Sequence, residues 1–171
     1  EDCFAKEISE INGNCFLCNN EQEIFSKIKS LLAEKGIQRF FCRETSDIVG
    51  KLEKYEIPFL SNEEDFSTME AGVTYCEFLV ARTGSVMVSA ASTSGRQMNI
   101  FPHIHFVLAK KSQIVPYISD ALSKMKEKYG EILPSSITNI TGPSRTADIE
   151  KTLILGAHGP KEIYVFLNCS E

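Results

Sequence analysis

The stretch IFPHIHFVLA, residues 100–109, does most to decide the fold of this chain. Its second half is an unbroken apolar run of strand length, which is typical of a strand covered on both faces. A final strand is expected at EIYVFLN, residues 162–168. The rest of the sequence must therefore supply the layers that cover these strands.

The N-terminal side of the chain shows helical periodicity. Apolar residues recur at helical spacing through residues 21–35, and Gly36 follows where a C-cap glycine is expected. The β-prone run IQRFFC, residues 37–42, and a second helical pattern over residues 46–54 come next. The first third of the chain is expected to alternate helix and strand.

The middle of the chain is rich in β-branched and aromatic residues. Two such runs, residues 73–81 and 85–90, flank the break Arg82-Thr83-Gly84. Because glycine supplies the positive φ that tight turns need, these runs are expected to form an antiparallel hairpin.

Two further elements follow the central stretch. They are a third helix over residues 112–129, with Pro116 in its first turn, and a short strand over residues 136–141. Strands interleaved with helices around a mixed central sheet define an α/β fold.

The composition bounds the class of protein. The chain has 171 residues, 43% of them hydrophobic, so residues 1–171 are expected to form one domain. The net charge is −5 and the pI about 5.3, which does not suit a nucleic-acid binder. No apolar run approaches the ~20 residues that cross a bilayer, and the first residues lack the pattern of a secretory signal. A cytoplasmic protein without nucleic-acid or membrane partners is expected.

The six cysteines form no recognisable metal pattern. Cys15 and Cys18 make one CxxC pair, with Cys3 upstream and Cys42 downstream, and no second tight pair completes a zinc or iron–sulfur site. Disulfide scaffolds are usually shorter and richer in cysteine. Reduced thiols are the preferred interpretation, with metal or redox use as the alternative. No cofactor or metal is predicted.

The segment TGPSRTAD, residues 141–148, concentrates groups that carry chemistry. Its hydroxyls and backbone N–H groups suit an anion beyond the carboxyl end of a strand, and Arg145 offers a bidentate grip on carboxylate or phosphate. The alternative is a structural turn in which Asp148 caps a short helix and pairs with Arg145. Residue spacing does not decide between the two.

Two histidines also stand out. His158 lies in GAHGP, residues 156–160, where two glycines and a proline allow a sharp turn. It suits a general acid/base, and it equally suits a loop histidine bonded to a carbonyl. His105 follows His103 in the central strand, but this pair lacks the further ligands that a metal site needs.

Several segments together resemble the LUD domain family, specifically its lactate utilization protein C (LutC, YkgG) group. They are ARTGS (81–85), GR (95–96), FPHIH (101–105), QIV (113–115), ITGPSRTADIE (140–150) and LGAHGPKEIYVFL (155–167). The resemblance is clearest over residues 72–168. Its most specific part is the pairing of GPSRTADIE with LGxHGP.

The resemblance implies a three-layer fold of the NagB/RpiA/CoA-transferase-like type. It also implies a role in converting L-lactate to pyruvate together with iron–sulfur partner proteins, whose ferredoxin-type cysteine run this chain lacks. The family's motif positions are Thr83, Gly84, Arg96, His105, Gly142, Pro143, Ser144, Arg145, Thr146, Asp148, His158 and Gly159. Arg82 stands where the family commonly has a glutamate, which removes a possible acid, base or nucleophile.

Three hypotheses follow. In the first, the chain is an accessory protein of lactate utilization that binds a small anion, anchored by Arg145. The ligand-binding residues are then Thr83, Gly84, Ser85, Arg96, His105, Gly142, Ser144, Arg145, Thr146 and Gly159. In the second, the chain is an enzyme acting on a small carboxylate, CoA ester or sugar phosphate, with His158 as general acid/base and Asp148 orienting it. In the third, the same loops form an interface with a partner protein.

Overall fold

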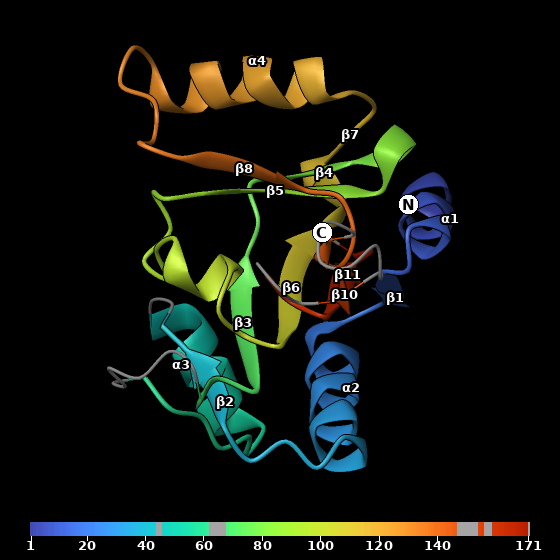
Figure 1. The fold of residues 1–171 in the computed structure, drawn as a ribbon, viewed down its shortest axis with the longest axis vertical. Helices are drawn as coiled ribbons and strands as arrows, with labels where there is room; N and C mark the ends of the chain where they lie inside the picture. The colour runs from blue at the N-terminus through green and yellow to red at the C-terminus, as the bar shows by residue number, and fades with distance from the viewer. Residues whose placement is uncertain (44–45, 62–67, 147–153, 156–158, 171) are drawn as a thin grey trace.

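A computed structural model describes residues 1–43, 46–61, 68–146, 154–155 and 159–170. The helices are α1 (Asp2–Glu10), α2 (Glu21–Glu34), α3 (Ser46–Lys54) and α4 (Ile118–Tyr129). Two sheets are stacked between them, with α2 and α3 covering one side of the stack and α4 the other (Figure 1). The predicted α/β class is confirmed.

The larger sheet is parallel and has the strand order β1-β11-β6-β3-β2. Its strands are β1 (Asn14–Cys18), β2 (Phe40–Cys42), β3 (Ala71–Tyr75), β6 (Ile104–Lys110) and β11 (Glu162–Asn168). The apolar run of residues 100–109 supplies β6, which pairs with β11 on one side and β3 on the other. A strand in this position is covered on both faces, which explains its unbroken apolar sequence.

Each face of the parallel sheet has its own core. On one face, Phe106 packs against Phe40 and Phe166, with ring centroids 5.8 and 5.5 Å apart, beneath α2 and α3. On the other face, Val107 and its neighbours pack against α1 and the second sheet.

The second sheet is mixed and has the order β7-β4-β5-β8. Its strands are β4 (Phe78–Val80), β5 (Ser85–Ser89), β7 (Ile114–Val115) and β8 (Ile137–Ile140). The predicted hairpin is confirmed as β4–β5, closed by a 3₁₀ turn and by Gly84 at φ +60°. The run over residues 73–81 is divided between the two sheets, so the antiparallel pairing lies in the second layer and not in the central sheet.

The helix expected over residues 112–129 begins only at Ile118. Residues before it form a 3₁₀ turn and then β7, which pairs with β4. Pro116 accounts for the difference, because the residue before a proline is disfavoured in the α region. Val115 therefore extends β7 and does not belong to the first turn of a helix.

Helix α1 and strand β1 were not predicted from the sequence. Helix α1 buries Phe4 and Ile8 against the second core, and it lies against the β4–β5 turn. A Cβ atom on Gly84 would lie 2.3 Å from the backbone nitrogen of Ile8. Glycine is thus required there both by its positive φ and by the approach of another backbone.

This contact predicts a large cost for Gly84→Ala. At Gly36, also at positive φ, a Cβ atom would meet nothing within 4 Å. Gly36→Ala should therefore lose only about 1 kcal/mol of unfolding free energy through backbone strain. Gly84→Ala should lose about 3 kcal/mol, because overpacking adds to that strain. Urea denaturation of both variants measures the difference, and equal losses would contradict the close approach of α1.

Candidate functional site

The end of α1 collects several of the predicted site residues in one place. We call this place the α1 corner and define it as residues 83–85, 141–145 and 159–160 with Ile11. The Ser144 N–H donates to the Pro160 carbonyl at 2.8 Å, and a Cβ atom on Gly159 would lie 3.2 Å from that of Ser144. The loop of residues 141–144 and the loop of residues 159–160 therefore lie against each other, although more than ten residues separate them in the sequence.

A chain of hydroxyl groups runs through the α1 corner. The Thr83 and Ser85 hydroxyls are 2.8 Å apart, and the Ser85 hydroxyl lies 2.9 Å from that of Thr141. Asn139 Nδ2 donates to the Thr141 hydroxyl at 3.3 Å. Each hydroxyl can donate and accept, so the direction of the chain can adapt to what binds at its end.

Gly142 and Arg145 attach this loop to the end of α1. Gly142 has φ +82°, and a Cβ atom there would lie 2.6 Å from the Ile11 carbonyl oxygen. Arg145 Nη2 donates to the same carbonyl at 2.9 Å. A cation at a helix C-terminus is favourable because the unpaired carbonyls there carry partial negative charge. Arg145 thus has a structural contact while its side chain stays exposed.

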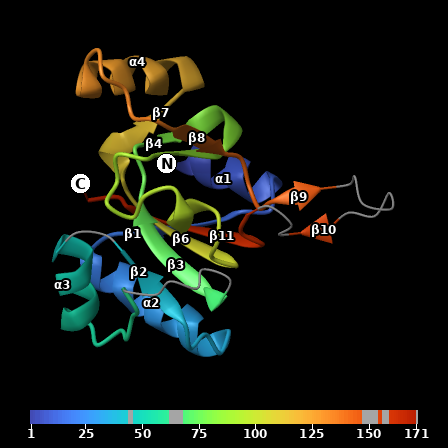
Figure 2. The same ribbon diagram turned by 60° about the vertical axis from the view of Figure 1, so that its left-hand side comes forward.

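Arg145 opens a short hairpin, while the alternative in which Asp148 caps a short helix lies outside the described residues. Strands β9 (Arg145–Thr146) and β10 (Ile154–Leu155) pair antiparallel and project from the body of the molecule (Figure 2). The hairpin leads into β11, so the loops adjoin the amino end of a parallel strand. Residues 141–148 were expected beyond the carboxyl end of a strand. Residue 141 does follow the carboxyl end of β8, but β8 belongs to the second sheet and not to the parallel one.

Arg96 lies apart from this group. Its Nη2 donates to the Ser135 hydroxyl at 2.7 Å, just before β8 begins. Thr141 follows the other end of the same strand. Arg82 also points elsewhere, with its guanidinium carbon 5.2 Å from the ring centroid of Tyr117. A side chain at position 82 can therefore contact the start of α4.

His105 is fully buried, on the same face of the parallel sheet as α1. Its Nε2 lies 2.8 Å from the Thr74 hydroxyl, while no partner among the described residues reaches Nδ1. Burial lowers the pKa of His105 to about 4, so the ring is neutral near pH 7. The neutral ring can donate or accept a hydrogen bond, but it carries no charge that would attract an anion.

Three of the predicted positions cannot be placed in the same way. Asp148 and His158, the two residues proposed for catalysis, lie outside the described residues, as does the side chain of Thr146. Their roles stay predictions.

The CxxC cysteines lie in β1, where Cys15 and Cys18 belong to the cores on opposite faces of the sheet. Burial raises the pKa of Cys15 to about 12 and that of Cys18 to about 11. Side chains on opposite faces of a strand point away from each other, so these two thiols cannot bind one metal ion together. The described residues contain no group of three or more His, Cys, Asp or Glu that could hold a metal ion.

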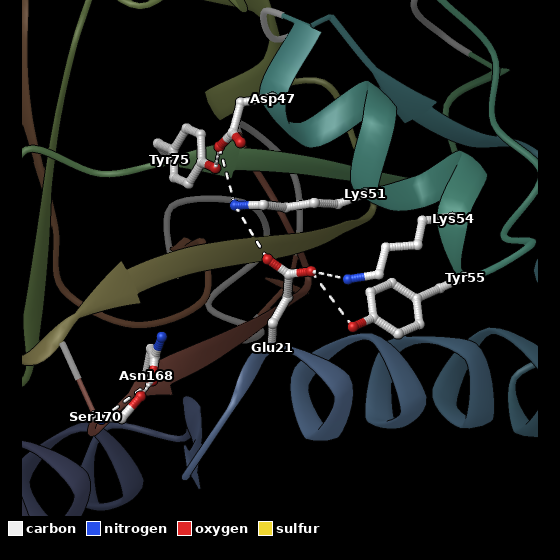
Figure 3. A network of polar contacts seen from close by, with 8 residues as sticks. All are labelled: Glu21, Asp47, Lys51, Lys54, Tyr55, Tyr75, Asn168 and Ser170. Atoms are coloured by element: carbon white, nitrogen blue, oxygen red, sulfur yellow. Dashed lines mark hydrogen bonds and ion pairs between the residues drawn. The ribbon is translucent and has the colours of Figure 1, made fainter.

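A polar network at the carboxyl ends of the parallel strands was not predicted (Figure 3). Lys51 bridges Asp47 at 3.0 Å and Glu21 at 3.5 Å, and the Tyr75 hydroxyl also donates to Asp47. The crevice beside it, which Asn168 also lines, has a volume of about 50 Å³. That volume holds a few water molecules and no organic ligand. Only the i,i+4 spacing of Asp47 and Lys51 could have indicated part of this network.

Three hydrogen-bonding members of the α1 corner were not among the predicted ligand-binding residues, namely Thr141 and the backbone carbonyls of Ile11 and Pro160. Thr141 lies in the quoted motif and its hydroxyl is among those expected to suit an anion, but it was not chosen as a ligand-binding residue. The Ile11 carbonyl is a backbone group, so residue types cannot reveal it.

Fold and site together define an α/β protein whose polar loops gather beside its first helix. The LUD domain model matches residues 2–167, and the chain belongs to the LUD domain family. The resemblance seen in the motifs is thereby confirmed. No helix among the described residues has the length and apolar character needed to cross a membrane.

Individual relatives match over shorter segments. Lactate utilization protein C of Bacillus licheniformis is 38% identical over 97 residues, which cover 55% of this chain and 40% of that protein. The uncharacterized protein YkgG of Escherichia coli is 36% identical over 101 residues, covering 57% and 44%. Lactate utilization protein C of Halalkalibacterium halodurans is 31% identical over 127 residues, covering 73% and 53%. The chain spans about half the length of these relatives.

A solved structure shares the fold. The crystal structure of a DUF162 family protein from Deinococcus radiodurans matches with a TM-score of 0.72, over 98% of this chain and 94% of that chain. The sequence identity is 16%, so the match shows the fold alone.

The buried His105 predicts a stability that depends on pH. Its folded pKa lies below the unfolded value of about 6.5, so the unfolded chain binds the proton more strongly and stability falls as pH falls from about 6.5 to about 4. The loss should reach about 3 kcal/mol at the acid end. Urea denaturation followed by circular dichroism measures it. His105→Gln should remove this part of the pH dependence, and the exposed His103→Gln should retain it; the same slope in all three proteins would refute the assignment.

Proposed function

We propose that this chain takes part in lactate utilization as a LutC-like protein and binds a small carboxylate at the α1 corner. The proposal is supported by family membership and by relatives named lactate utilization protein C. It is also supported by the chemistry of the corner, where an arginine and several hydroxyl groups come from two separate segments, residues 83–85 and 141–145.

The exposed guanidinium of Arg145 is the observation that carries this proposal. One nitrogen donates to the Ile11 carbonyl at 2.9 Å, which restrains the position of the group. The guanidinium has five N–H donors in a fixed fork, so one bond to Ile11 leaves several for a ligand. This restraint lowers the entropy that the side chain loses when a ligand binds.

The hydroxyl groups of the corner suit the rest of such a ligand. Lactate carries a hydroxyl beside its carboxylate, whereas pyruvate carries a carbonyl there. The hydroxyl chain through Thr83, Ser85 and Thr141 can accept from the first and donate to the second. The corner is therefore suited to both members of the lactate–pyruvate pair.

Oxidation of lactate to pyruvate releases two electrons and two protons, which an acceptor must take up. We propose that iron–sulfur partner proteins supply this acceptor, since the cysteines of this chain lack the spacing that holds a cluster. The projecting β9–β10 hairpin is a suitable place for partner contact, because its strands extend beyond the two sheets (Figure 2). The partner interface of the third hypothesis is therefore part of the same proposal as the anion site of the first.

A stand-alone enzyme is the alternative, with His158 as acid/base and Asp148 orienting it. Arg82 counts against it, because no carboxylate stands at that position and the arginine contacts Tyr117. Turnover of a 2-hydroxy acid, CoA ester or sugar phosphate by the purified chain would favour this alternative.

Calorimetry with L-lactate and with pyruvate tests the carboxylate site. Arg145→Ala should weaken binding about tenfold or more, because charge-assisted hydrogen bonds are lost. Arg145→Lys should give an intermediate loss, since the charge remains without the fork.

Arg96→Ala is the matched control, because Arg96 is an exposed arginine bonded to Ser135 at the other end of β8. It should bind as the unaltered chain does. Circular dichroism checks that each variant is folded. Equal affinities in the Arg145 and Arg96 variants would rule out the proposed anchor.

A further inference from the structure

A second hollow lies away from the α1 corner, where the end of α4 meets both sheets. It has a volume of about 260 Å³ and is lined by the β3–β4 connection, the segment after β5 and the last turn of α4. The ends of β5 and α4 lie on the same side of the molecule (Figure 1). None of the residues that line it belongs to the site proposed above.

Glu77 forms the charged wall of this hollow. Its side chain is 8% exposed, and it is the one carboxylate among the buried side chains of the described residues. Its Oε1 accepts from the Ser89 hydroxyl at 2.6 Å and from the Tyr129 hydroxyl at 2.7 Å. Its Oε2 accepts from Lys128 Nζ at 2.7 Å.

The carboxylate is held in its charged form. Burial alone would raise the pKa of Glu77, but hydrogen bonds from Lys128, Ser89 and Tyr129 outweigh burial and lower it. The backbone is fixed as well, since Gln113 Nε2 donates to the carbonyls of Cys76 and Glu77. A fixed, buried negative charge at the wall of a hollow favours a cation inside it.

The chain already places an ammonium group in this position. Lys128 Nζ contacts Glu77 Oε2 and lies 5.0 Å from the ring centroid of Tyr129. A carboxylate and an aromatic face are the two groups that recognise ammonium ions. The Lys128 side chain is 55% exposed, so its ammonium can return to solvent when another ammonium takes its place beside Glu77.

The remaining walls favour an amine that carries an apolar body. Tyr75 and Tyr129 line the hollow with aromatic rings, and Cys76 and Ala91 add apolar surface. The Tyr75 hydroxyl donates to Asp47, which holds that ring in place (Figure 3). An anion is disfavoured beside Glu77.

We propose that this hollow binds a small primary amine with an apolar body, whose ammonium displaces that of Lys128 from Glu77. The site is independent of the carboxylate site at the α1 corner. Lys128 then acts as an internal competitor. Its removal should therefore strengthen binding, whereas loss of a merely structural ion pair would not.

Titration of the ¹⁵N-labelled chain with phenethylamine tests the proposal, with the shifts of the Ala91 and Ser92 amides as the readout. Phenethyl alcohol and 3-phenylpropionate are the neutral and anionic comparison compounds. Lys128→Met should bind phenethylamine about tenfold more tightly than the unaltered chain, as expected if Lys128 occupies the site most of the time. Lys124→Met, which removes another exposed lysine of α4, should leave the affinity unchanged.

Glu77→Gln should abolish saturable binding of the amine while the alcohol and the carboxylate bind none of the variants. If Glu77→Gln does not fold, the Lys128→Met comparison decides, because Lys128 is mostly exposed. The proposal is overturned if Lys128→Met binds phenethylamine no more tightly than Lys124→Met. It is equally overturned if the alcohol or the carboxylate binds as well as the amine.

Discussion

The close packing of α1 against two glycines is the constraint on which the candidate site depends. Gly84 and Gly142 each meet α1 or the residue after it so closely that any Cβ atom would overlap backbone atoms. These contacts join the turn of the second sheet and the motif-bearing loop to one helix end. Arg145 adds a hydrogen bond to the same Ile11 carbonyl that Gly142 approaches. The geometry of the site therefore depends on these two glycines, and its chemistry depends on the polar residues next to them.

Much of the fold could be predicted from periodicity alone. The bounds of α3 and β11 agree with prediction, and β6 was identified as the buried strand because its apolar run is unbroken. Helix α1 was missed although Phe4 and Ile8 recur at helical spacing, because its N-cap residue Glu1 makes no side-chain hydrogen bond and no capping signal marks its start. The division of residues 73–81 between two sheets was missed because periodicity gives strand character and not the partner strand.

The predicted site residues also divide into those whose position could be inferred from the sequence and those whose position could not. The fold brings together most of the predicted ligand-binding residues, namely Thr83, Gly84, Ser85, Gly142, Ser144, Arg145 and Gly159. Arg96 lies at the far end of β8. A motif identifies residues that matter, but topology decides which of them are neighbours. Glu77 carried a signal that was not used, since it is a lone charge inside the apolar run over residues 73–81. Such a charge is either exposed at an edge or buried with partners, and here it has three.

The most direct test of the central claim is amide hydrogen exchange at Ser144, whose N–H donates to the Pro160 carbonyl in the α1 corner. Phe4→Leu loosens α1 at a fully buried anchor, and Phe25→Leu makes the same change in α2. If α1 holds the corner together, Phe4→Leu will speed exchange at Ser144 markedly more than Phe25→Leu does. Equal exchange rates in the two variants, with both folded, would contradict the account.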